Sequence, residues 1–347
     1  MATIYKTFLN NDVASTRTLL HEAIPITGSI VSGTYAEANI KDFTTDLVQQ
    51  VYDYPYLSSS ANHIFDITAG YSANSTLSAS AVADGISATD IKNKINMYNE
   101  MAQVLMGYDL TGSILEFDQD GDLGAGGTKL KEIYVLNFAR LLTKDEIKKG
   151  SFNLQLATGS TFSTIDFGDI LTLTDYNAQN DFRVNSPVGE YGILYTSSFD
   201  INTGSGVGLL YYQAGVAILT ASIFGLAEMD ADASVGPAVL SGSNIITNAN
   251  SLRRRMYDLD FNNTTELNST IYFCRVNHNE YNYSANPTYL SASQIVVKQE
   301  TTDAPVSFLT TIGLYSADNE LLATAKLSEP LKKDPNNELI LRVRLDY

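Results

Sequence analysis

Apolar and polar residues alternate along the last forty residues of the chain. One alternating run covers residues 306–314, a second covers 320–327, and a third covers 339–346. The tetrapeptide Ser-Ala-Asp-Asn at 316–319 separates the first two runs. A period of two around an Asp/Asn turn is typical of half-buried antiparallel strands. The sequence therefore predicts an antiparallel sheet over 306–346.

Short apolar runs of strand length recur through the rest of the chain. They cover residues 133–138, 152–156, 170–174, 189–196, 208–213, 216–223 and the region from 269 onward. Residues 90–108 differ, because apolar side chains recur there at steps of three and four, with Asp90 as the expected N-cap. A second helix is expected at 248–257. We therefore predict a mainly β, α+β fold of antiparallel β-sandwich or barrel-like modules with one or two amphipathic helices.

Three domains are predicted from the order of these elements. Residues 1–150 would form an N-terminal arm plus an α+β domain, 151–268 a β-rich middle domain, and 269–347 a C-terminal antiparallel β domain. Within the first domain, the arm is expected to be extended and to lead into a strand near 26–32. We also expect a loop of small side chains at 69–89, and a very short helix opened by a capping box at 143–146.

No charged residue occurs between residues 201 and 227. A helix that crosses a bilayer needs about 20 apolar residues, but this segment is interrupted by Tyr211-Tyr212-Gln213 and by Gly215. We therefore interpret it as two buried strands and expect no membrane partner. A long uncharged segment can also become buried between copies of a protein. The residues predicted to form such an interface are Leu209, Leu210, Tyr211, Tyr212, Val216, Ile218, Leu219, Ile223 and Phe224.

Composition narrows the classes of partner. The chain has 347 residues, a net charge of −17, 21 tyrosines and no tryptophan. So acidic a chain is repelled by phosphate backbones, which argues against nucleic-acid binding. We interpret the basic run 253–255 as a local surface or interface feature. The single cysteine, Cys274, excludes an internal disulfide framework, and its apolar neighbours predict a buried thiol.

The acidic loop near residue 120 is the strongest candidate for ion binding. Asp118, Asp120 and Asp122 occupy alternate positions, and such spacing can surround a Ca²⁺ or Mg²⁺ ion with oxygen ligands. The EF-hand pattern fails, because the glycine is at the fourth place and Lys129 stands at the twelfth, where a glutamate is required. Two interpretations stay open: an exposed glycine-rich turn, and a weak cation site.

Five segments carry a family resemblance. Residues 279–289 (NEYNYSANPTY), 310–323 (TTIGLYSADNELLA) and 325–331 (AKLSEPL) together resemble uncharacterised virion structural proteins of tailed bacteriophages, especially contractile-tailed phages of aquatic bacteria. The hairpin at 312–323 is similar to a strand pair in tail-collar and baseplate-associated proteins. The N-terminal segments 18–25 and 52–57 look like the same group.

This resemblance implies a non-enzymatic structural subunit of a phage virion, made in the host cytoplasm. The expected location is the tail, at the baseplate or neck. The expected partners are copies of the chain itself and sheath, tube, baseplate or fibre proteins. No catalytic residue and no cofactor follows from it. Three alternatives stay open: a capsid decoration or head–tail connector protein, a receptor- or glycan-binding module that uses tyrosine rings, and a carboxylate-based glycosidase, for which no acidic pair stands out.

Overall fold

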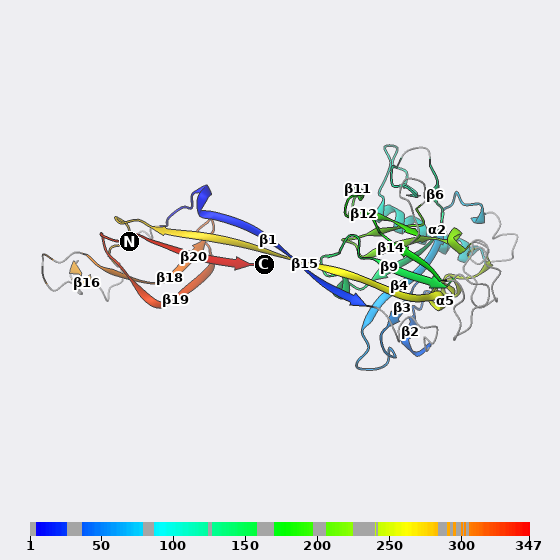
Figure 1. The fold of residues 1–347 in the computed structure, drawn as a ribbon, viewed down its shortest axis with the longest axis horizontal. Coiled ribbons are helices and arrows are strands. Elements are labelled where there is room, and N and C mark those ends of the chain that lie inside the picture. The colour runs from blue at the N-terminus through cyan, green and yellow to red at the C-terminus, as the bar shows by residue number, and fades with distance from the viewer. Residues whose placement is uncertain are drawn as a thin grey trace. The chain divides into compact units, whose positions relative to one another are not determined.

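The chain divides into two compact units (Figure 1). Unit 1 comprises Met1–Leu19 and Glu266–Tyr347, and unit 2 comprises Leu20–Thr265. The division into three domains that the sequence suggests stays a prediction. The computed structural model describes residues 5–25, 37–78, 87–123, 127–157, 170–196, 206–224, 240, 242–283, 290–291, 294–295, 300, 302 and 305–347.

The predicted mainly β, α+β fold is confirmed. Strands of unit 2 follow one another in the order β2 (Ile40–Asp42), β3 (Gln49–Tyr52), β4 (His63–Tyr71), β7 (Glu132–Phe138), β14 (Val216–Thr220), β13 (Gly208–Tyr211), β12 (Gly189–Thr196), β10 (Ile170–Thr174) and β9 (Asn153–Ala157). The order continues to β15 (Met256–Val276) and β1 (Val13–Pro25), while β11 (Arg183–Ser186) pairs with β12 and β8 (Glu146–Ile147) pairs with β15. The strand pairs with assigned registers are antiparallel.

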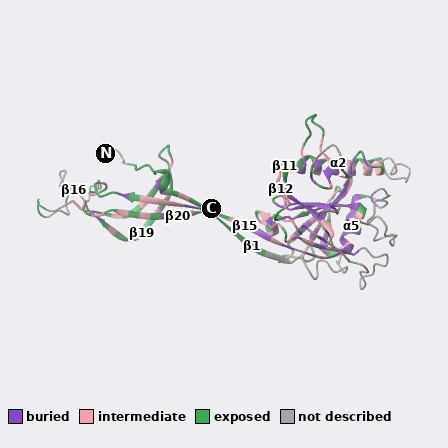
Figure 2. Cartoon of the chain, turned by 45° about the horizontal axis from the view of Figure 1, so that its top comes forward, coloured by how far each residue is buried: buried purple, intermediate pink, exposed green. Residues whose placement is uncertain are grey.

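Buried residues are concentrated inside unit 2 (Figure 2), where they form two hydrophobic clusters on the two faces of this sheet. Along β14, Ala217 and Leu219 belong to one cluster, and Val216 and Ile218 belong to the other. A strand that is buried on both faces has no need of polar residues. This explains the apolar runs at 208–213 and 216–223, of which Gly208–Tyr211 and Val216–Thr220 are buried strands as predicted, while 221–224 form a 3-10 turn.

The first cluster lies between strands of the sheet that face each other. Phe138 of β7 packs against Phe261 of β15, with ring centroids 5.3 Å apart, and Phe152 lies 6.0 Å from Phe138. All three rings are buried. The rings are tilted against one another, and such packing of aromatic rings from separate strands is typical of the core between two β-sheet layers.

Helix α2 (Ala88–Leu105) confirms the predicted helix and covers the second cluster with Tyr98, Ala102 and Leu105. Its N-cap is Ser87, whose hydroxyl accepts from the Thr89 N–H at 3.1 Å, and not Asp90 as expected. The helix lies very close to β4 at Gly70, because a Cβ there would be only 2.6 Å from the Lys94 carbonyl oxygen. Glycine at this position therefore sets the distance between helix and sheet.

Several local predictions need correction. Helix α5 spans Ile245–Arg255, three residues earlier at its start than predicted. The capping box at 143–146 opens no helix: α3 (Arg140–Thr143) ends there, and β8 follows. The expected small-residue loop fails at its start, because residues 69–71 complete β4 and are buried. The arm forms β1 at Val13–Pro25, and the strand expected near 26–32 lies outside the described residues. Short 3-10 turns span Asn10–Asp12, Glu37–Asn39 and Ala221–Phe224.

Unit 1 contains the predicted C-terminal strands. The later part of β15 pairs with β20 (Leu339–Asp346), and β18 (Ser307–Tyr315) pairs with β19 (Leu321–Lys333). Two short strands, β16 (Leu290–Ser291) and β17 (Gln294–Ile295), form a further pair. β19 continues past the predicted end at 327, because the register shifts between Leu309 and Thr311 and the resulting bulge accommodates Pro330.

Among the helices that the structure describes, none has the length and apolar character that a membrane crossing requires.

Candidate functional site

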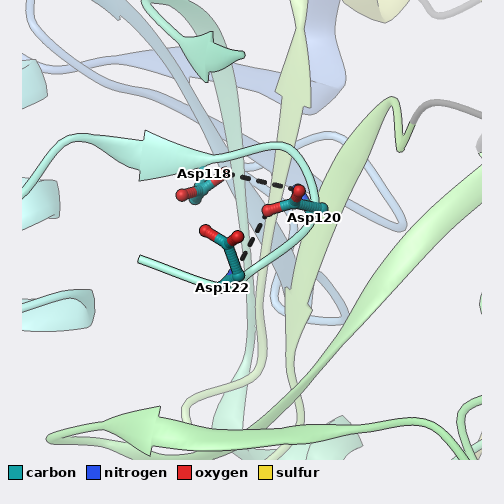
Figure 3. A group of neighbouring side chains, drawn as sticks. All are labelled: Asp118, Asp120 and Asp122. Atoms are coloured by element: carbon teal, nitrogen blue, oxygen red, sulfur yellow. Dashed lines mark hydrogen bonds between the residues drawn. The ribbon is translucent and has the colours of Figure 1, made fainter. Parts of the chain in front are cut away.

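The acidic loop is positioned by a short hairpin of unit 2. Its strands are β5 (Phe117–Asp118) and β6 (Lys129–Leu130). Phe117 packs edge-on against Tyr98 of α2, with centroids 5.4 Å apart, and the Tyr98 hydroxyl donates to the Leu130 carbonyl at 2.9 Å. The hairpin is therefore fixed to the helix; Asp118 ends β5, and Asp120 and Asp122 lie in the loop that follows it (Figure 3).

The three carboxylates of the loop come close together. One oxygen atom from each of Asp118, Asp120 and Asp122 can be chosen so that all three lie within 4.8 Å of one another. Asp118 is buried, while Asp120 and Asp122 are exposed. The Asp122 N–H donates to Asp120 Oδ1 at 3.2 Å, and this bond is the main reason that the pKa of Asp120 is lowered (Figure 3).

A lysine already neutralises the buried carboxylate of the loop. The Lys129 ammonium contacts Asp118 Oδ2 from the facing position of the hairpin. A divalent cation at these carboxylates would be repelled by this ammonium. Lys129 thus replaces the glutamate that an EF-hand requires, and its positive charge opposes cation binding. The weak cation site stays a prediction, and in the described structure the lysine is the counter-ion.

The residues that were predicted to form an interface are mostly buried inside this chain. Leu209, Leu210, Tyr211, Tyr212, Ile218 and Leu219 have no exposed surface, Val216 is 8% exposed, and Ile223 is half-buried. For Phe224 only the backbone, in a 3-10 turn, is described. The segment lies between β7 and β12 in the sheet, so its apolar side chains are covered by this chain and not by a partner. The same correction applies to the basic run, because Arg253 and Arg255 are buried.

Unit 1 contains a pocket of about 530 Å³ that the sequence reasoning missed. The apolar part of its wall comes from the N-terminal segment, β15, β18 and β20: Phe8, Phe273, Val276, Leu309, Ile312, Leu314 and Leu341. Cys274 also lines the pocket; it is half-buried and its pKa is raised by that burial. A volume of this size lies in the range of ligand sites.

Half-exposed aromatic rings stand around this pocket. Tyr5, Phe8, Tyr281 and Tyr315 line it and keep 43%, 40%, 38% and 43% of their surface exposed. Tyr5 and Tyr315 are in edge-to-face contact at 4.8 Å. Tyr281 has a positive φ of 53°, which is a strained backbone for a bulky residue. Such strain often accompanies a functional position.

The charged groups at the pocket are paired with one another. Arg275 contacts Asp12, which is buried, and the Leu9 N–H donates to Asp12 Oδ2 at 3.0 Å. The Leu9 bond, together with Arg275, lowers the pKa of Asp12. Lys6 and Glu280 form an ion pair at 2.5 Å, and this contact lowers the pKa of Glu280. Because these charges compensate each other, the pocket suits an uncharged apolar group.

One signal in the sequence pointed to this region. The alternating strands at 306–314 and 339–346 were recognised, but alternation predicts only that one face is half-buried. It does not say whether the chain itself covers that face. The N-terminal segment and β15, which complete the wall, are more than 250 residues apart in sequence.

Comparisons with known proteins return nothing: no family model, no curated protein and no solved structure matches the chain.

Proposed function

We propose that this protein is a non-enzymatic structural subunit of a bacteriophage virion, a tail component of the baseplate or neck, and that unit 1 supplies its contacts with other subunits. The phage assignment rests on the resemblance of the C-terminal and N-terminal segments. The assembly role rests on the structure of unit 1.

One observation carries the assembly role. Among the described residues of unit 1, three apolar side chains are buried: Val276, Leu314 and Val343. Among the same described residues, fourteen large apolar side chains are exposed, although unit 1 has only 101 of the 347 residues. Four of them, Tyr5, Phe8, Tyr281 and Tyr315, gather around one pocket, and exposed apolar residues that gather in one place are typical of interfaces between subunits.

Particle composition tests this proposal. Phage particles that contain the protein would be purified, and gold-labelled antibody against the chain would be located by electron microscopy. Label at the baseplate or neck supports a tail component. Label on the head would replace it by the decoration or connector alternative, and absence from particles would contradict the proposal. Turnover of cell-wall glycan by the purified protein would contradict the non-enzymatic role.

A second function, receptor or glycan binding, is favoured by the loop between β3 and β4. Tyr54, Tyr56 and Leu57 are exposed there, at 57%, 38% and 85%. Aromatic rings that protrude from a well-packed unit can stack on sugar rings. A glycan array with the full chain tests this function, and Tyr54→Ala should remove any signal that the loop produces.

A further inference from the structure

We propose that the pocket of unit 1 is a self-association site, which receives the apolar end of the β18–β19 hairpin from a second copy of this chain. The proposal rests on the proposed assembly role and names the partner and the surface. The donating side chains are Leu321 and Leu322, and the accepting wall is formed by β15, β18, β20 and the N-terminal segment.

The end of the β18–β19 hairpin presents two exposed leucines that can insert into the pocket of another copy. Leu321 and Leu322 begin β19 and are 53% and 68% exposed. Two adjacent leucines in a strand point to opposite faces. If the chain packed against this hairpin, it would bury at least one of them. Neither is buried in this chain. The connecting turn is well defined, because the Ser316 N–H donates to the Glu320 carbonyl at 2.8 Å. The leucines are thus presented on a stable turn.

The hairpin end and the pocket lie next to each other on one surface. Ser316, Ala317 and Asn319 of the turn line the pocket, and Leu321 follows two residues later. A two-fold axis near this turn would place the hairpin end of each copy at the pocket of the other. An interface between identical copies must be self-complementary in this way.

The distribution of charge favours unit 1 over unit 2 as the site of contact between two copies. Unit 2 has 28 acidic and 13 basic residues, a net charge of −15, whereas unit 1 has 11 acidic and 9 basic residues, a net charge of −2. Two copies of unit 2 repel each other strongly, and two copies of unit 1 hardly do. The paired ions Asp12–Arg275 and Lys6–Glu280 keep the pocket itself neutral.

The exposed rings supply a large part of the area that such an interface needs. The rings of Tyr5, Phe8, Tyr281 and Tyr315 together leave about 330 Å² open, if a ring residue has about 200 Å² to bury. A standard interface buries about 800 Å² on each partner. The four rings alone would therefore supply roughly two fifths of one side, and the hairpin end adds to this area.

Sedimentation velocity of the full chain over a range of concentrations tests the proposal. Wild-type protein should form a larger species as its concentration rises. Leu322→Asp, which places a charge on the donor, should weaken association at least tenfold. Thr311→Arg, which places a bulky cation at an exposed position of the pocket wall, should do the same. Leu141→Asp is the matched control, because Leu141 is an equally exposed leucine (70%) of unit 2, and it should associate like wild type.

The single thiol of the chain supplies a second readout. Cys274 lines the pocket, so its alkylation by N-ethylmaleimide should slow several-fold when wild-type protein associates and should not slow for Leu322→Asp at the same concentration. Equal melting temperatures of the variants would show that the substitutions leave the fold intact.

Three results would overturn this inference: monomeric wild type at every concentration, association equally sensitive to Leu141→Asp and Leu322→Asp, or association without protection of Cys274. A monomeric protein that is nevertheless found in phage particles would refute self-association alone and leave the assembly role in place.

Discussion

Units 1 and 2 use the same kind of strand in opposite ways. In unit 2, strands such as β13 and β14 are buried on both faces, and two hydrophobic clusters fill the space around them. In unit 1, β18 and β19 have one half-buried face and one exposed face, and neither hydrophobic cluster includes any of their residues. A closed core and an open apolar surface are therefore separated within one chain.

Charge follows the same separation. Most of the net charge of −17 lies in unit 2, so copies of unit 2 repel one another. Unit 1 is nearly neutral and rich in exposed apolar side chains.

Removal of one aromatic ring should affect the two units very differently. Phe138→Ala leaves a cavity among buried rings of unit 2, so we expect a loss of about 3–5 kcal/mol in the free energy of unfolding. Phe308→Ala removes a 44% exposed ring of unit 1 and should change it by no more than about 0.5 kcal/mol. Denaturant unfolding measures both. Similar losses would show that unit 1 has a closed core after all.

The buried lysine of α2 should make stability depend on pH. The Lys94 ammonium has no exposed surface and contacts the carbonyl oxygens of Leu240 and Ser243. Burial lowers the pKa of Lys94 from 10.5 to about 8. Between these values the unfolded chain binds the proton and the folded chain does not, so stability rises with pH.

The difference in unfolding free energy between wild type and Lys94→Met isolates this group from the tyrosines that titrate in the same range. It should move in favour of wild type by up to roughly 3 kcal/mol between pH 8 and 10.5, and it should be flat below pH 7. A difference that does not change with pH would mean that the lysine keeps its ordinary pKa in the fold.

The close approach of α2 to the sheet should be sensitive to one methyl group. Gly70→Ala places a Cβ 2.6 Å from the Lys94 carbonyl oxygen, and neither backbone can yield easily. We expect a loss of about 1–3 kcal/mol, measured by thermal unfolding. Gly242→Ala is the control, since a Cβ there meets nothing within 4 Å. Equal effects of the two substitutions would contradict the tight packing.

Salt should strengthen contacts between copies through unit 1. At low ionic strength the acidic units repel each other over roughly 30 Å, and at 0.15 M salt this range falls to about 8 Å. We therefore expect the dissociation constant for self-association to fall a few-fold as salt is raised from about 0.01 to 0.15 M. Sedimentation equilibrium measures it. Weaker association in salt would indicate that ion pairs, and not apolar contacts, hold the copies together.

The smallest effect is expected at the acidic loop. Millimolar calcium should raise the melting temperature of wild type very little, because Lys129 already neutralises Asp118. Lys129→Met removes the competing ammonium, so this variant should be less stable without calcium and gain more from it. Lys129→Met combined with Asp120→Asn is the control that should lose the gain. If calcium stabilises none of these proteins, the acidic loop is not a cation site.

Most strands were predictable because burial on one or both faces leaves a pattern in the sequence. The runs at 170–174 and 189–196 correspond residue for residue to β10 and β12. The short helix at 143–146 was wrong because a capping box favours a helix only locally, whereas pairing of Glu146 and Ile147 with β15 uses the same backbone in a ladder. Tertiary pairing prevailed over the local signal.

The sites were less predictable for a related reason. An uncharged segment shows that residues such as Leu210 and Ile218 are buried, but not whether the same chain or a partner buries them. The pocket of unit 1 depends on side chains as distant in sequence as Phe8 and Leu341, which no local pattern links. The spacing of the three aspartates did survive as a real cluster, because neighbours in one loop are close by necessity.

The place of unit 2 within the chain has a consequence for evolution and engineering. Unit 2 is an insertion, since Leu20–Thr265 interrupts unit 1, and its two ends meet: His21 Nδ1 and Thr264 Oγ1 are 3.1 Å apart. β1 and β15 both run through the join, so a module that replaced unit 2 would have to continue this strand pair at its two ends. A lineage could thus exchange the larger module and retain the smaller one, and a designer could graft a cargo domain at the same junction.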